Sequence, residues 1–145
     1  MDYRELLFYQ KAREVIKGVN TEIKKWPNMM QAQVMSRQLF RAATSVGANI
    51  AEGHGRHEGL EYIHFLRIAQ ASANEVDHWL NTALDCEIGS PPQIKHLIQF
   101  NNETRKMLTK TIYTLSNQKN LRSLSEAPTP YSLIPYSPEE DEILP

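Results

Sequence analysis

The chain has 145 residues, 41% of them hydrophobic and 23% charged, and its 16 Lys and Arg against 17 Asp and Glu leave a formal net charge of −1. This length fits one domain that buries its core without disulfide bonds, and the single Cys86 agrees with a reducing, cytoplasmic environment. The chain has no run of about 18 apolar residues and no secretory signal at its start, which predicts a cytoplasmic protein without a membrane span. The near-neutral charge argues against a strongly basic nucleic-acid-binding domain.

Prolines and glycines divide the first part of the chain into four helix-length segments. The breaks fall at Pro27, at a glycine-rich stretch near residue 56, and at the Pro91-Pro92 pair. Apolar residues recur within the segments at spacings of three and four, which predicts helices. We expect these helices over residues 3–25, 29–53, 58–88 and 92–118. Short connections between them predict an all-α fold, an antiparallel up-down four-helix bundle over residues 1–120.

Two helix ends carry local signals. Ser90 before Pro91-Pro92 is typical of an N-cap followed by proline in the first turn. Gly53 after Glu52 predicts the C-terminal cap of the second helix. The pair Gly53 and Gly55 also resembles part of a phosphate-binding loop, but it follows a helix and lacks the GK[ST] ending. We therefore expect a turn that ends the second helix.

Residues 121–145 differ in composition from the rest of the chain. They contain five of the eight prolines and have a net charge of −4, which leaves +3 for residues 1–120. This composition predicts an extended, proline-rich acidic C-terminal tail. The tail also contains apolar side chains such as Tyr131 and Ile134. Two interpretations stay open: a disordered end, or a strap that docks on its own assembly or on a partner.

The second expected helix has almost no polar face for water. Residues 42–51 contain no charged side chain. Ala43, Gly47 and Ala51 are small residues at a spacing of four, which would let another helix approach closely. A helix of a lone bundle keeps one face for solvent. We therefore expect a homo-oligomer, with Ala43, Gly47 and Ala51 at the interface between subunits.

A polar row follows the same helix, and antiparallel pairing places polar residues of the third helix opposite it. Because a buried charge must be paired, we expect Arg41 to meet Glu75, with Ser45 and Ser72 nearby. We expect Glu52 to bond to backbone or to a side chain of the first helix. The full expected network is Gln38, Arg41, Ser45, Asn49, Glu52, Ser72 and Glu75.

Neither catalysis nor metal binding is favoured by these polar residues. Ser45 has no His or Cys base beside it in the row, so a structural network is favoured over a catalytic site. His54, His57 and His64 bracket the turn between the second and third helices without the spacing of metal ligands. We therefore expect no catalytic residue, no metal and no cofactor.

Basic side chains gather on the first and fourth expected helices. Such charges usually form a solvated helix face, but in an assembly of several subunits the repeated patch would hold a polyanion. Lys95, Lys106 and Lys110 share one flank, and Arg105 is adjacent. The candidate nucleic-acid-binding residues are Lys11, Lys17, Lys24, Lys25, Lys95, Arg105, Lys106 and Lys110.

The stretch QLFRAATSVGANIAEG from Gln38 to Gly53, followed by Arg56 and then EYIHFLRIAQASANEVDHWL, resembles a four-helix-bundle protein family. That family includes proteins encoded by intervening sequences inside bacterial large-subunit ribosomal RNA genes, and it is related in fold to the accessory variability determinants of diversity-generating retroelements. The resemblance covers about residues 3–118. It implies a homopentameric barrel without enzymatic activity. In the retroelement relatives, the pentamer binds a reverse transcriptase and structured RNA through basic surfaces.

Residues and resemblance together predict a non-enzymatic homo-oligomeric accessory protein. Its expected partner is structured RNA, or a ribonucleoprotein that contains a reverse transcriptase, and no small-molecule substrate is evident. The alternative is a protein-binding scaffold without a nucleic-acid role, in which residues 121–145 act as the contact or as a lock.

Overall fold

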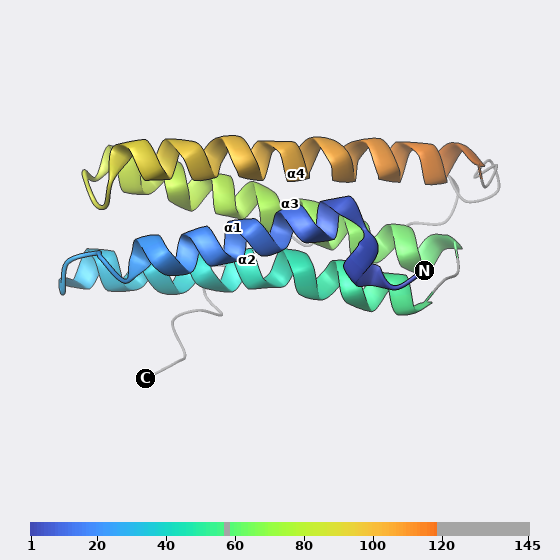
Figure 1. Ribbon diagram of the computed structural model, residues 1–145, viewed down its shortest axis with the longest axis horizontal. Coiled ribbons are helices and arrows are strands. Elements are labelled where there is room, and N and C mark those ends of the chain that lie inside the picture. Colours follow the sequence, from blue (N-terminus) through green and yellow to red (C-terminus); the bar gives the residue numbers. More distant parts are fainter. Residues whose placement is uncertain (57–58, 119–145) are drawn as a thin grey trace.

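The computed structural model describes residues 1–56 and 59–118, which form four long helices and one short 3-10 helix (Figure 1). The expected tail, residues 121–145, lies outside the described residues, as does His57. The elements are η1 Tyr3–Glu5, α1 Leu7–Ile23, α2 Met30–Arg56, α3 Gly59–Asp85 and α4 Pro91–Gln118.

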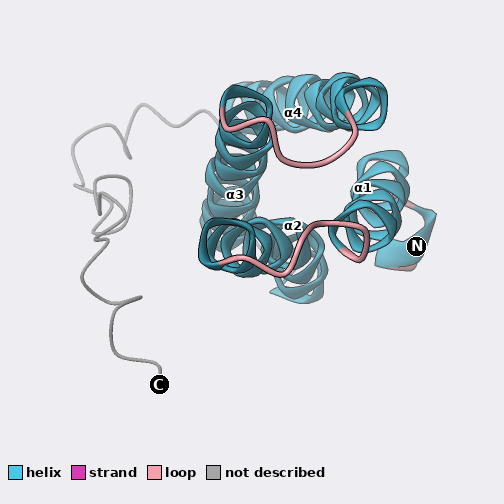
Figure 2. Ribbon diagram, turned by 90° about the vertical axis from the view of Figure 1, so that its left-hand side faces the viewer, coloured by secondary structure: helices cyan, strands magenta, loops and turns pink. Residues whose placement is uncertain are grey.

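The four helices run antiparallel to their neighbours in chain order. Seen end-on, α1 lies beside α2 and α4, and α3 lies beside the same two helices on the opposite side (Figure 2). This confirms the all-α, up-down four-helix bundle. In the part of the chain that the structure describes, no helix has both the length and the apolar content needed to cross a membrane.

Two helix boundaries differ from those expected. The first helix is interrupted at Leu6, whose backbone is extended, so that η1 and α1 replace one continuous helix. The second helix continues through Gly53 and Gly55 to Arg56, and the prediction that Gly53 caps it was wrong. Gly53 instead allows close packing, because a β-carbon placed there would lie 2.7 Å from Cβ of Phe65 on α3.

Large aliphatic side chains from α2, α3 and α4 fill the centre of the bundle. Leu39, Leu66, Leu80, Ile94 and Leu108 each have no exposed surface. They recur at helical spacings on the inward faces, as the apolar periodicity predicts. Burying one such side chain contributes roughly 1.5–3 kcal/mol to folding, so the core is the main source of stability.

Two of the small residues of α2 pack within the bundle of the same chain. Ala43 is 1% exposed and belongs to the core. A β-carbon on Gly47 would lie 3.6 Å from the Tyr9 ring and 3.8 Å from Ile16, both on α1. Two of the three residues predicted at a subunit interface, Ala43 and Gly47, therefore pack inside the chain's own bundle, whereas Ala51 is partly exposed.

A buried carboxylate ties the end of α1 to the start of α4. Glu22 is only 2% exposed. Its Oε1 accepts one hydrogen bond from the backbone N–H of Ser90 at 2.6 Å and another from the indole Nε1–H of Trp26 at 3.3 Å. Ser90 precedes α4, and its carbonyl accepts from the N–H of Ile94 at 2.9 Å, as expected of an N-cap residue. Gly89 beside it has a φ of 88°, a conformation that favours glycine.

Candidate functional site

The polar row of α2 meets α3 largely as predicted. Arg41 Nη2 donates to Glu75 Oε1 at 2.8 Å, and the hydroxyls of Ser45 and Ser72 lie 2.9 Å apart. The Asn49 amide donates back to the Ser45 carbonyl at 2.8 Å within α2. The Arg41–Glu75 and Ser45–Ser72 contacts cross the α2–α3 interface, so they help to fix the register of the two helices.

Other members of this network were misplaced or missed. Glu52 accepts from Arg56, one turn later on α2, at 2.8 Å, and so the prediction of a backbone or first-helix partner was wrong. The side-chain amide oxygen Oε1 of Gln38 accepts from Arg41 Nη2 at 2.9 Å. Trp79, which the sequence did not single out, donates its indole N–H to Glu75 at 3.2 Å. Its spacing of four from Glu75 on one helix was the available signal.

The described residues bring together no metal-binding group. Among residues 1–56 and 59–118, no three His, Cys, Asp or Glu side chains are placed to hold an ion. His54 Nε2 lies 2.8 Å from the Met1 carbonyl oxygen, so this side chain contacts the start of the chain. This statement on metal binding does not include His57, which lies outside the described residues.

Two of the candidate lysines on α1 form ion pairs within the bundle. Lys11 donates to Glu103 of α4, and its ammonium also lies 4.9 Å from the centre of the Phe100 ring. This hydrogen bond, together with the lysine's charge, lowers the pKa of the Glu103 carboxyl. Lys17 pairs with Glu14 at 3.2 Å. Both lysines are therefore partly neutralised, which weakens their case as contacts for a polyanion.

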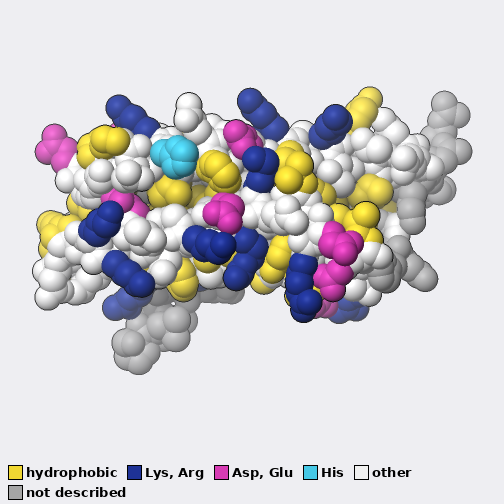
Figure 3. Space-filling view, viewed as in Figure 1, with side chains coloured by type: hydrophobic (Ala, Val, Ile, Leu, Met, Phe, Trp, Pro, Cys, Tyr) yellow, Lys and Arg dark blue, Asp and Glu magenta, His cyan; other side chains and the backbone are white. Residues whose placement is uncertain are grey.

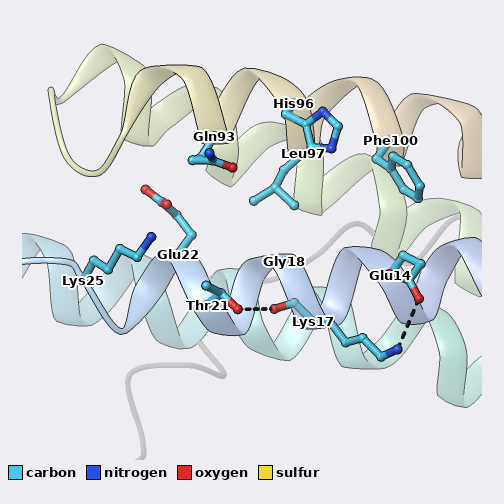
Figure 4. A pocket seen from close by; sticks show the side chains of 10 residues that line it. All are labelled: Glu14, Lys17, Gly18, Thr21, Glu22, Lys25, Gln93, His96, Leu97 and Phe100. Atoms are coloured by element: carbon cyan, nitrogen blue, oxygen red, sulfur yellow. Dashed lines mark hydrogen bonds and ion pairs between the residues drawn. The ribbon is translucent and has the colours of Figure 1, made fainter.

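The groove between α1 and α4 has mixed charge (Figure 4). Its volume is about 300 Å³, and Lys17 and Lys25 share its walls with Glu14 and Glu22. In Figure 4 the Glu22 carboxylate points from α1 towards α4, near Gln93. Carboxylates next to the lysines repel phosphate, so this groove is a poor candidate for binding a polyanion.

The groove between α3 and α4 combines cations, amides and one aromatic ring. Its volume is about 680 Å³, within the usual range of ligand sites. Gln70 of α3 donates to Thr109 of α4 at 2.7 Å across its floor. The residues that line it are Gln70, Asn74, Asn102, Arg105, Lys106, Thr109, Lys110 and Tyr113.

Arg105 is held in place inside this groove. Its Nε donates to Asn74 Oδ1 and its Nη1 to Asn102 Oδ1, both at 2.8 Å. Asp77 lies 3.7 Å from Nη1 and offsets part of the charge. The guanidinium therefore spans the two helices in a fixed orientation, with Nη2 uninvolved in these three contacts.

Three other predicted cations lie along α4. Lys95, Lys106 and Lys110 are exposed, and within residues 1–56 and 59–118 none of them forms an ion pair. Figure 3 shows Lys and Arg side chains spread over the face formed by α1 and α4, with acidic and hydrophobic side chains between them. Lys24 and Lys25 are exposed beyond the end of α1.

Sequence reasoning found the cations of the α3–α4 groove but missed its other walls. Tyr113 lies seven residues after Lys106 and three after Lys110, spacings that place it on the same flank of the helix. Gln70 and Asn74 come from α3, and nothing in the sequence alone shows which face of α3 meets α4. The groove could therefore be predicted only in part.

Comparisons with known proteins agree with this fold. Curated proteins gave no match. A crystal structure from Bacteroides thetaiotaomicron VPI-5482, described as a protein with unknown function from the S23 ribosomal protein family, is similar with a TM-score of 0.68 and 29% identity over 73% of this chain and 98% of that chain. The sequence model of the family described as 23S rRNA-intervening sequence protein matches residues 4–110. The chain therefore belongs to the 23S rRNA-intervening sequence protein family.

Proposed function

We propose that this protein is a non-enzymatic accessory protein that binds structured RNA through α4. The observation that carries the proposal is the row of exposed, unpaired cations Lys95, Lys106 and Lys110 within the described chain. α4 carries four basic side chains against Glu103 alone, and Glu103 is paired with Lys11 of α1. Membership of a family named for a ribosomal RNA intervening sequence supports RNA over other polyanions.

Replacing the α4 lysines together tests this function. The triple variant Lys95→Gln, Lys106→Gln, Lys110→Gln is expected to weaken binding of the full-length chain to an RNA hairpin by at least about ten-fold, because three phosphate contacts are lost. The slope of log affinity against log salt should fall by roughly one for each contact. Fluorescence anisotropy at several salt concentrations measures both quantities.

A second triple variant serves as the matched control. Arg4→Gln, Lys17→Gln, Arg56→Gln removes the same charge, but each of these side chains pairs with a carboxylate within four residues of it in the sequence. It should retain most of the affinity for the hairpin. If both variants bind equally, the row does not hold RNA; if the unaltered protein does not bind, the scaffold alternative is favoured.

We also propose that the bundle forms a homo-oligomer, and that this oligomer is the pentamer implied by the family resemblance. Met30 and Val34, one turn apart on α2, are 72% and 52% exposed, and such apolar side chains gain from burial against another subunit. The reverse-transcriptase partner implied by the same resemblance stays a prediction.

The mass of the protein in solution tests the assembly. Light scattering should give a multiple of the 16.7 kDa chain mass, and Val34→Glu should lower it because the charge opposes burial. Leu7→Glu on α1, at a residue 55% exposed, is the control and should leave the mass unchanged. A mass of one chain for the unaltered protein would contradict the oligomer.

A further inference from the structure

We propose that the α3–α4 groove binds unpaired RNA nucleotides, with Tyr113 as the stacking surface for a base. Lys106 and Lys110 would contact the adjoining phosphates, and the amides of Asn74 and Asn102 would contact base edges. The inference rests on the proposed function and deepens it, because it names the part of a structured RNA that enters the groove.

Tyr113 is the first observation that points to a base. It is an aromatic residue, 68% exposed, that lines the polar groove about two helical turns after Lys106. Aromatic rings in basic grooves bind unpaired nucleic acid because every base offers a π-face for stacking. A stacked base would cover the exposed ring and leave its phosphates beside the lysines.

The amide groups supply the second observation. The oxygens of Asn74 and Asn102 both accept hydrogen bonds from Arg105. Each amide therefore turns its oxygen towards the guanidinium and retains an NH₂ group, for which no partner is found among the described residues. These NH₂ groups donate only, so they suit the ring-nitrogen and carbonyl acceptors of an exposed base edge.

The dimensions favour a single strand over a duplex. From Lys106 to Tyr113 the row advances seven residues, about 10 Å along the helix axis. That length matches about three stacked nucleotides at 3.4 Å each. A duplex keeps its bases stacked inside and is recognised through backbone and 2′-hydroxyl contacts over roughly 16 base pairs, which makes no use of a protruding aromatic ring.

A comparison of probes and variants tests the inference with the full-length protein. We expect an oligouridine of about ten nucleotides to bind more tightly than a blunt RNA duplex of equal charge. Tyr113→Ala should weaken oligouridine binding by about 5- to 100-fold, because one stacked base is lost. Tyr113→Phe should retain the affinity, since the ring is kept, and duplex binding should be unchanged in both variants.

The outcomes separate this inference from the proposed function. If duplex binds as tightly as oligouridine and Tyr113→Ala changes neither affinity, the protein still binds RNA and the groove assignment is overturned. If no RNA binds, both proposals fail. If a polyglutamate peptide displaces oligouridine at equal charge concentration, the groove binds acidic chains in general, and the assignment to nucleotides is likewise overturned. Circular dichroism of each variant checks that the bundle is folded.

Discussion

Gly89→Ala is expected to lower the free energy of unfolding by about 3 kcal/mol or more. Gly89 has a φ of 88°, which an alanine adopts only with strain. An added β-carbon would also lie 2.7 Å from Oε1 of Glu22 and 2.9 Å from Cδ1 of Ile94, and it would overlap the Trp26 indole nitrogen. The substitution therefore disturbs the hydrogen bonds that Glu22 accepts from Trp26 and Ser90.

Urea unfolding followed by circular dichroism measures this loss, at one protein concentration because assembly shifts apparent stability. Gly55→Ala is the control: nothing lies within 4 Å of a β-carbon there, and the residue is inside α2. It should be neutral or stabilising, by up to about 1 kcal/mol. A Gly89→Ala protein as stable as the unaltered one would show that the hydrogen bonds accepted by Glu22 contribute little to the free energy of unfolding.

The same substitution at two glycines of α2 should have opposite effects. Gly53→Ala is expected to destabilise by about 1–2 kcal/mol, because its methyl would press against Cβ of Phe65 at 2.7 Å and against the Tyr62 ring at 3.2 Å. Gly47→Ala should stabilise by about 0.5–1 kcal/mol, since its methyl meets Tyr9 and Ile16 at ordinary contact distances and alanine favours the helix.

Thermal and urea unfolding of both variants measure the difference between their free energies of unfolding, which we expect to be about 1.5–3 kcal/mol. Each glycine is the control for the other, because helix propensity changes by the same amount at both positions. Equal effects would mean that α2 and α3 can move apart at Gly53 without a loss of stability, and that close packing there is unimportant.

The helices were predictable because their signals are local. Pro27 and Pro91 interrupt helices by their own covalent structure, and apolar spacing reports which residues face inward. The pairing of Arg41 with Glu75 was also predictable, since a short connection forces α2 and α3 to be antiparallel. The end of α2 was misjudged, because a glycine that caps a helix and one that permits close packing look alike in a sequence.

What the sequence could not provide is which faces of distant helices meet. The small residue Gly47 predicts a close neighbour, but only the fold shows that α1 of the same chain lies against it. In the same way, Lys11 counts as a free cation in the sequence and is paired with Glu103, 92 residues later, in the structure. The groove wall supplied by α3 was missed for the same reason.

The carboxylate of Glu22 also gives α4 an electrostatic direction. The N-terminal end of a helix attracts anions through its free N–H groups and its dipole, and here Glu22 already accepts from the N–H of Ser90 at that end. A phosphate chain following α4 would be repelled by Glu22 at that end, where Lys95 offsets part of the repulsion, and attracted to Lys106 and Lys110, which begin about 24 Å away along the axis. An RNA strand on this bundle would therefore be held most strongly towards the C-terminal end of α4, with Lys95 as its contact nearest to Glu22.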